Sequence, residues 1–237
     1  MINDCTLYHE YNEKSLQIAI SIAISKNSFE DIKYIFSSPL VKHKDKIDIH
    51  LGNDSFLAEA SSNGNLEIVR YLLTSTDLKE HSNIRANHGY AFNLACRYGH
   101  LDVVKYLTAS PELNKHVNIF EANNYALQLA CQHNQVEIVR YLLTSNELNN
   151  HPDILDKSHS SFQLASINNS FDVIKYLIFD YNIENNDYIK MIRDRYYNSE
   201  VEKMFELRKT HDDLKQELNN HKEKNKNLNI SNKKLKL

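Results

Sequence analysis

Residues 98–108 read YGHLDVVKYLT, and this stretch decides the fold because it recurs in register along the chain. Matching segments begin at residues 63, 98, 133 and 168, a step of 35 residues each time, and read NGNLEIVRYLL, YGHLDVVKYLT, HNQVEIVRYLL and NNSFDVIKYLI. A fifth copy, KNSFEDIKYIF, begins at residue 26. Self-similarity at a fixed period of about 20–50 residues indicates a repeat architecture.

Each repeat predicts a hairpin of two helices. In the copy quoted above, Leu101, Val104 and Leu107 recur at helical spacing, and a shorter apolar segment, YAFNLAC from Tyr90, precedes them. Between the two segments, one column holds only the residue types that best tolerate the left-handed backbone ending a helix. This column is Asn27, Gly64, Gly99, Asn134 and Asn169. We therefore predict an all-α chain with five tight reversals.

Three further columns predict which side chains of the second helix face solvent and which pack between repeats. An acid near its start suits the positive end of the helix dipole, and a base three residues later predicts an i, i+3 ion pair on a solvated edge. A tyrosine follows the base, and we interpret it as packing between repeats with its hydroxyl at the edge. The columns are Glu30, Glu67, Asp102, Glu137 and Asp172; Lys33, Arg70, Lys105, Arg140 and Lys175; and Tyr34, Tyr71, Tyr106, Tyr141 and Tyr176.

A short extra helical turn is predicted after each of three second helices. Ser110 can cap a helix, Pro111 suits its first position and Glu112 its first turn, and segments from Ser75 and Ser145 repeat this pattern. A histidine column, His81, His116 and His151, follows. Stacked helical units lie about 8–10 Å apart, whereas zinc ligands converge to about 2.0–2.3 Å, so we expect these histidines to end the short helix rather than to bind metal.

These segments together resemble the ankyrin-repeat family over residues 17–180 or so. The resemblance is carried by ACRYGHLDVVKYL from Ala95, which is similar to the family's small-residue helix, Gly-His-Leu turn and Val-Val-Lys-Leu-Leu second helix. The chain departs from the family's Thr-Pro-Leu-His motif, and Asn93, Gln128 and Gln163 stand where its histidine is expected. The resemblance implies an ankyrin-like solenoid of stacked hairpins with a concave face that binds another protein. It also suggests a host-directed effector or a viral protein as the setting.

The candidate partner-binding residues are exposed positions that vary from repeat to repeat on the fingers and first helices. Large amphipathic side chains such as Arg97, Tyr98 and Phe120 are the type that anchors protein interfaces. The full set is Arg85, Asn87, His88, Arg97, Tyr98, Phe120, Glu121, Asn123, Gln132, His133, Asp156 and His159.

The predicted organisation is a repeat array followed by a cap and a tail. The expected segments are an N-terminal cap over 1–16, repeats over 17–52, 53–88, 89–123, 124–158 and 159–184, cap helices over 185–207 and a charged tail over 208–237.

Composition excludes several classes of function. The net charge of −3 gives no general attraction to nucleic acid, although residues 222–237 hold six Lys against one Glu. No apolar run is long enough to insert in a membrane, and no Gly-rich phosphate loop is present. Cys5, Cys96 and Cys131 are an odd number that argues against a disulfide framework. We expect a cytoplasmic, non-enzymatic protein without cofactor or metal, with Cys96 and Cys131 as packing residues.

The tail admits two interpretations. A heptad places Met204, His211, Leu218, Asn225 and Asn232 in one column and Leu207, Leu214, His221, Leu228 and Leu235 in the other. The second column favours a short coiled coil, which would make the protein a self-associating scaffold, whereas the polar residues of the first column weaken such a core. The alternative is a single helix that ends in a disordered basic tail.

Overall fold

The computed structural model describes residue 8 and residues 11–154, 161–183, 187–196 and 198–234. These residues form two compact units, unit 1 over residues 1–170 and unit 2 over residues 171–237. All regular structure in the described residues is helical, which confirms the prediction of an all-α chain.

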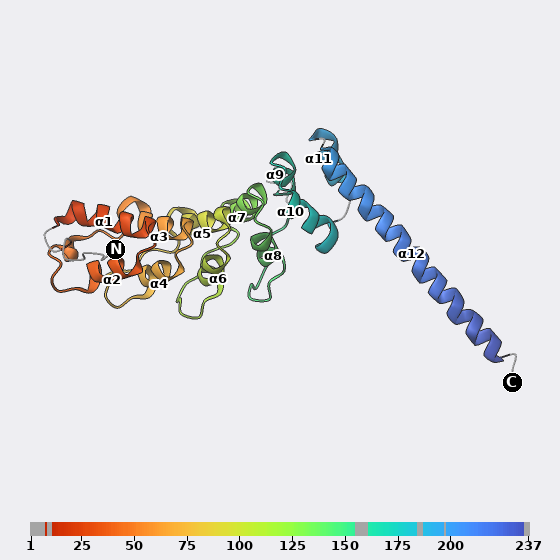
Figure 1. Ribbon diagram of the computed structural model, residues 1–237, viewed down its shortest axis with the longest axis horizontal. Coiled ribbons are helices and arrows are strands. Elements are labelled where there is room, and N and C mark those ends of the chain that lie inside the picture. The colour runs from red at the N-terminus through yellow and green to blue at the C-terminus, as the bar shows by residue number, and fades with distance from the viewer. Residues whose placement is uncertain (1–7, 9–10, 155–160, 184–186, 197, 235–237) are drawn as a thin grey trace. The chain divides into compact units, whose positions relative to one another are not determined.

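Unit 1 is a stack of helical hairpins. Figure 1 shows its first helices in one row and its second helices in a second row, with neighbours in each row in contact. This arrangement confirms the predicted solenoid. The first helices are α1 (Glu13–Ser25), α3 (Leu51–Ser62), α5 (Ala86–Tyr98), α7 (Glu121–Gln132) and α9 (Ser161–Ile167), and the second helices are α2 (Phe29–Ser37), α4 (Leu66–Thr74), α6 (Leu101–Ala109) and α8 (Val136–Thr144).

A column of alanines lets the first helices lie close together. Its members are Ala23, Ala60, Ala95, Ala130 and Ala165, all buried. A neighbouring column supplies the large side chains that fill the space between repeats, namely Ile20, Leu57, Phe92, Leu127 and Phe162. Burying one such side chain contributes about 1.5–3 kcal/mol, and it requires the adjacent repeat.

The predicted turn column is confirmed, since all five of its residues have a positive φ, from 52° at Asn27 to 83° at Gly99. The residue just after each of the last four turns has a side chain that donates a hydrogen bond to a carbonyl near the end of the preceding first helix. The pairs are Asn65 to Ile24 (2.7 Å), His100 to Ser62 (2.8 Å), Gln135 to Arg97 (3.1 Å) and Ser170 to Gln132 (3.2 Å). The bonds to Ser62, Arg97 and Gln132 satisfy carbonyls that a helix end leaves without an intrahelical partner, whereas the Ile24 carbonyl also accepts the Asn27 N–H (2.9 Å).

The choice between glycine and asparagine in the turn column follows from these bonds. A Cβ atom on Gly64 would lie 2.4 Å from His100 Nδ1, and one on Gly99 would lie 2.2 Å from Gln135 Oε1. Where the turn residue is Asn134, the bonding residue of the next repeat is the small Ser170. A long side chain at the hydrogen-bonding position, such as His100 or Gln135, therefore requires glycine in the turn of the preceding repeat.

Each first helix in the middle of unit 1 is entered through a left-handed corner. Residues 52–54 of α3 have φ of 61°, 58° and 62°, and residues 87–89 of α5 have φ of 46°, 57° and 70°. Side chains hold these corners, since Asp54 Oδ1 accepts the Asn83 N–H (2.8 Å) and Asn93 Nδ2 donates to the His88 carbonyl (3.3 Å). Asn93 thus occupies the place of the expected histidine and fixes the corner from inside.

The predicted extra turn after the second helices forms, but it is not helical. The segments from Ser75, Ser110 and Ser145 each form one turn, closed by the Leu78, Leu113 and Leu148 N–H groups at 3.2–3.3 Å. The serine hydroxyl accepts the N–H two residues later, as at Asp77 (3.2 Å), which is the bond expected of a capping serine, but the turn does not continue as a helix. A short 3₁₀ helix, η2 (Lys44–Lys46), occurs in the first connection instead.

The histidine column caps a different helix from the one expected. His81 Nε2 donates to the Ser75 carbonyl (3.0 Å) and His116 Nε2 to the Ser110 carbonyl (2.9 Å), just beyond the second helices α4 and α6. His151 Nδ1 donates to the Leu142 carbonyl inside the last turn of α8 (3.0 Å). These histidines therefore satisfy carbonyls at the negative ends of the second helices.

The tyrosine column is buried in unit 1 as predicted at Tyr71, Tyr106 and Tyr141. The Tyr71 hydroxyl donates to Asp77 (3.0 Å), and burial followed by this bond raises the pKa of Tyr71. The basic column contacts these rings from the preceding repeat, with Arg70 5.3 Å above Tyr106. The i, i+3 ion pair forms between Glu137 and Arg140 (3.7 Å), while Arg70 pairs with Glu112 of the next connection (3.1 Å).

Unit 2 contains the second helix of the last repeat and the C-terminal helices. The last repeat continues as α10 (Phe171–Lys175) and then as one wider π-helical turn, η3 (Tyr176–Asp180). Two helices follow in the chain, α11 (Asp187–Arg195) and α12 (Ser199–Lys234), and their role as a cap stays a prediction. Helix α12 does not end at residue 207, because it runs without interruption into the tail.

The coupling between turn residue and bonding residue is testable by a double-mutant cycle at Gly99 and Gln135. We expect Gly99→Asn alone to lower the free energy of unfolding by about 1–2 kcal/mol, because the new side chain displaces Gln135 from the Arg97 carbonyl. Gln135→Ser in the same chain, which copies the Asn134 and Ser170 pair, should recover about 1 kcal/mol. Urea unfolding measures both values, and strictly additive effects would contradict the coupling.

Candidate functional site

The exposed side chains of the first helices form one surface of unit 1, here named the first-helix face. Ile18, Ser55, Tyr90 and Tyr125 take equivalent positions on successive helices, and Tyr90 and Tyr125 are 44% and 43% exposed. Adjacent aromatic rings on rigid helices offer contact area at a low cost in conformational entropy. The centre of this face is therefore aromatic on α5 and α7.

Four of the predicted contacts lie at the C-terminal ends of α5 and α7. They are Arg97, Tyr98, Gln132 and His133. The Arg97 guanidinium lies 5.4 Å above the exposed Tyr98 ring. Burial and then the positive charge of Arg97 lower the pKa of His133, so this imidazole is neutral at pH 7. Tyr98 is exposed, whereas Arg97, Gln132 and His133 are only partly exposed, so the prediction that all four are exposed is wrong for these three. The cluster places one cation, Arg97, beside the Tyr98 ring.

Four other predicted contacts lie at the opposite ends of the first helices, where the connections enter the corners. They are Arg85, Asn87, His88 and Phe120, all exposed. Arg85 Nε donates to the His116 carbonyl of the next connection (3.1 Å), which ties two neighbouring connections together. The predicted residues thus form two groups at the two ends of the first-helix face rather than one patch.

The remaining four predicted contacts have no described side chain. Glu121 and Asn123 belong to α7, but only their backbone is described, and Asp156 and His159 lie outside the described residues. The residues that sequence reasoning missed are Tyr90 and Tyr125, which lie between the two groups. Their signal was the column position shared with Ser55, since a core position would not accept both serine and tyrosine.

A family model of ankyrin repeats matches residues 16–120 and 109–188 of the chain, in three copies of the repeat per model. The chain belongs to the ankyrin-repeat family. No curated protein and no solved structure matches it. Ankyrin repeats generally mediate protein–protein interaction and are typically non-enzymatic modules.

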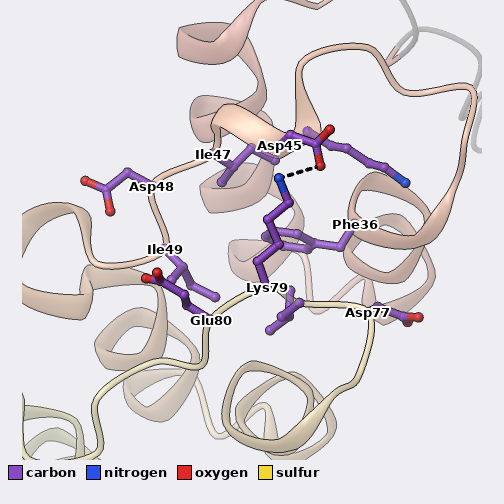
Figure 2. A pocket seen from close by; sticks show the side chains of 10 residues that line it. Phe36, Asp45, Ile47, Asp48, Ile49, Asp77, Lys79 and Glu80 are labelled. Atoms are coloured by element: carbon purple, nitrogen blue, oxygen red, sulfur yellow. Dashed lines mark ion pairs between the residues drawn. The ribbon is translucent and has the colours of Figure 1, made fainter.

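A pocket of about 380 Å³ lies between the first two connections of the ankyrin stack. Figure 2 shows Lys79 reaching across it to Asp45, with Nζ 3.1 Å from Oδ1, while the carboxylates of Asp48 and Asp77 point outward on opposite sides. Across the described part of the chain, no group of three or more His, Cys, Asp or Glu residues has the geometry to hold a metal ion. The Lys79–Asp45 ion pair thus links the two connections that line the pocket.

His50 links this pocket to the corner of α3. Its Nδ1 lies 2.9 Å from Asp54 Oδ1 and its Nε2 lies 3.3 Å from Glu80 Oε2. Desolvation acts to lower the pKa of His50, but the hydrogen bond and charge of Asp54, with Glu80 and Asp48, outweigh it and raise the pKa above its ordinary value. Protonated His50 thus bridges two carboxylates of neighbouring repeats.

The two cysteines of the ankyrin core are packing residues. Cys96 and Cys131 are fully buried free thiols, and burial raises the pKa of both. They occupy the column that holds Ser61 and Ser166 in other repeats, next to the alanine column. A buried thiol with a raised pKa is a poor nucleophile, which agrees with the packing role expected for both cysteines.

Among the described residues, no helix combines the length and the apolar composition that a membrane span requires.

We expect Cys96 and Cys131 to resist modification in the folded chain. In a Cys5→Ser variant, an aromatic disulfide reagent at pH 8 should label neither thiol within minutes, because both are buried and protonated. Labelling should become complete in urea. Fast stoichiometric labelling of one thiol in the native variant would contradict the packing role.

The His50 bridge predicts a pH-dependent contribution to stability. Since the pKa of folded His50 is raised above the unfolded value, the bridge should stabilise fully below about pH 6.5 and lose its effect as the pH rises through the folded pKa. His50→Gln should therefore lower the free energy of unfolding more at pH 5.5 than at pH 8.5. Because His50 is 42% exposed, solvent screening should keep this difference below about 1 kcal/mol. Urea unfolding at both pH values tests it, and an equal effect at both would contradict the bridge.

Proposed function

We propose that this ankyrin chain binds a partner protein through the first-helix face, with α5 and α7 as its centre. The observation that carries the proposal is a concentration of exposed aromatic rings. Four of the five exposed aromatic residues among the described residues lie on or beside these two helices, namely Tyr90, Tyr98, Phe120 and Tyr125. Tyrosine and arginine in the centre of a face are the commonest anchors of protein interfaces.

The chemistry of the face favours a partner that offers both apolar and acidic groups. Tyr90 and Tyr125 supply flat apolar area with a polar edge. Arg97 at one end and Arg85 at the other can each donate hydrogen bonds to a carboxylate, although Arg85 already donates one bond to the next connection. An acidic peptide or helix with apolar residues between its charges fits this pattern.

The rigidity of unit 1 supports binding with little rearrangement. The alanine column, the side-chain bonds between repeats and the buried tyrosines hold α5 and α7 at a fixed spacing. A preorganised face loses little conformational entropy when it binds. A host-cell protein as the partner, which the resemblance suggests, is part of this proposal and requires capture experiments with host lysate.

The test compares substitutions within and outside the face. We expect Tyr90→Ala with Tyr125→Ala, and separately Arg97→Ala with Tyr98→Ala and Phe120→Ala, each to weaken the captured partner's affinity about tenfold or more, since anchor residues contribute about 2 kcal/mol or more. Tyr181→Ala in unit 2 is the matched control, because it also removes an exposed tyrosine.

Affinity capture followed by titration of the purified partner against each variant provides the measurement. Because the four substituted aromatic residues are exposed and Arg97 is only partly buried, the thermal unfolding midpoint should stay within a few degrees of the parent value. Full retention of the partner by both face variants would refute the proposal.

A further inference from the structure

The start of helix α12 is anchored by contacts within unit 2. Val201 and Phe205 are buried in unit 2, and Arg193 of α11 forms two hydrogen bonds to Glu202 and lies 4.2 Å above the Phe205 ring. These contacts fix the first two turns of the helix.

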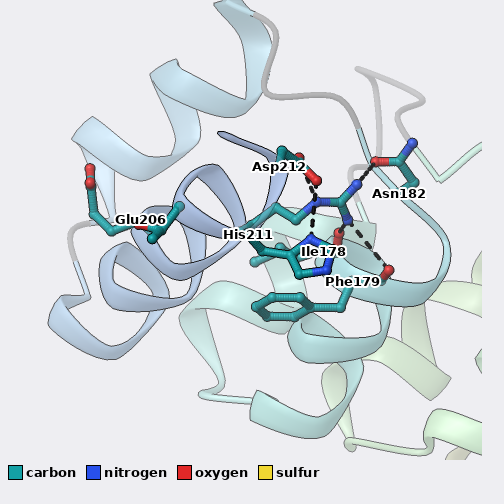
Figure 3. A network of polar contacts seen from close by, with 8 residues as sticks. Ile178, Phe179, Asn182, Glu206, His211 and Asp212 are labelled. Atoms are coloured by element: carbon teal, nitrogen blue, oxygen red, sulfur yellow. Dashed lines mark hydrogen bonds and ion pairs between the residues drawn. The ribbon is translucent and has the colours of Figure 1, made fainter. Parts of the chain in front are cut away.

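A second anchor follows one turn later. Arg208 donates to the carbonyls of Ile178 and Phe179 at the end of η3, to Asn182 and to Asp212 (2.7 Å for Asp212), a network shown in Figure 3. The π-helical turn leaves these carbonyls without intrahelical partners, and the guanidinium satisfies them. Beyond Arg208 the helix has no further anchor of this kind among the described contacts of unit 2.

The next part of α12 is exposed on every side. All side chains from 209 to 223 are exposed, and the helix includes Leu207, Leu214 and Leu218 at 63%, 61% and 55% exposure. The spacings of seven and four residues place the three leucines on one face of the helix. An isolated helix with a mostly polar surface is only marginally stable in water. Burial of the three leucines against another surface would stabilise this part of α12.

We propose that α12 pairs with α12 of a second copy of this chain as a parallel two-stranded coiled coil. Leu207 and Leu214 take one core position of the heptad, and His211 and Leu218 take the other. The two helices cover each other's leucines. The leucine stripe of α12 and the first-helix face consist of different residues. The pairing and the proposed function can therefore be tested independently.

Charge complementarity argues for a second copy as the occupant. Glu217 and Lys222 flank the core on opposite sides, five residues apart. In a parallel coiled coil this spacing brings Glu217 of one copy next to Lys222 of the other, twice by symmetry. Residues 209–223 contain three Lys against four acids, so two copies carry little net charge against each other.

The same charges exclude antiparallel pairing. On the flank that holds Lys222, the preceding heptads place Lys215 and Arg208. Antiparallel helices bring this flank against itself, which would set basic residues against basic residues. The parallel arrangement places the unit 2 ends of both copies at the same end of the coiled coil. Each dimer then carries two first-helix faces, which raises the affinity for a partner with two binding segments.

Molar mass tests the pairing. Light scattering of the full chain across a concentration series up to about 100 µM should show a mass rising from 27.7 kDa to twice that value. Leu214→Lys with Leu218→Lys should remain monomeric throughout, because a charge in the core prevents closure. Leu40→Lys is the matched control, since Leu40 is 60% exposed in unit 1, and it should dimerise like the parent. A parent chain that stays at 27.7 kDa at the highest concentration would overturn the proposal.

Charge reversal tests the orientation. Lys222→Glu should weaken the dimer about tenfold, because it sets two acids against each other at two symmetric places. Glu217→Lys should act in the same direction. The double swap Glu217→Lys with Lys222→Glu should restore the parent dissociation constant within about threefold. A stronger dimer for Lys222→Glu alone would show antiparallel pairing and overturn the parallel arrangement.

Discussion

The close approach of the first helices is the constraint on which the rest of unit 1 depends. Alanine at five equivalent positions removes the side-chain bulk that would separate them, and Phe92 and its equivalents then fill the space beside the column. Each helix can bury these groups only against its neighbours, so stability is shared along the stack. The alanine and the large apolar residue recur with a period of 35 residues because every repeat packs on its neighbour in the same way.

The hydrogen bonds between repeats and the aromatic face follow from that spacing. The side chain after each of the last four turns reaches a carbonyl of the preceding first helix, as Gln135 reaches Arg97 at 3.1 Å, because the two helices are close enough for one side chain to span the distance between them. The same spacing brings Tyr90 and Tyr125 into one row on the opposite side of the alanines. The spacing of the first helices thus determines both the packing between repeats and the arrangement of the exposed tyrosines.

Signals within single repeats were enough to predict the helices and turns of the fold. Features that depend on contacts between repeats could not be predicted in this way. The left-handed turns were predictable because asparagine and glycine answer a backbone requirement at one residue, whereas the choice of Gly99 over asparagine depends on Gln135 in the next repeat. At Ser110 the local signal was only partly right, because the hydroxyl accepts the Glu112 N–H as a capping serine does, yet the segment forms a single turn and no helix. The exposure of Tyr90 was missed because an apolar helical position does not reveal which side a neighbour covers.

The central claim is that the hairpins are stabilised by one another through the alanine column. Hydrogen exchange of the full chain with and without Ala95→Leu tests it most directly, since the added side chain should cost about 1–3 kcal/mol by forcing α5 away from its neighbours. The account predicts that α3 and α7 lose protection together with α5. Loss of protection confined to α5 would show that the hairpins are independent and would contradict it.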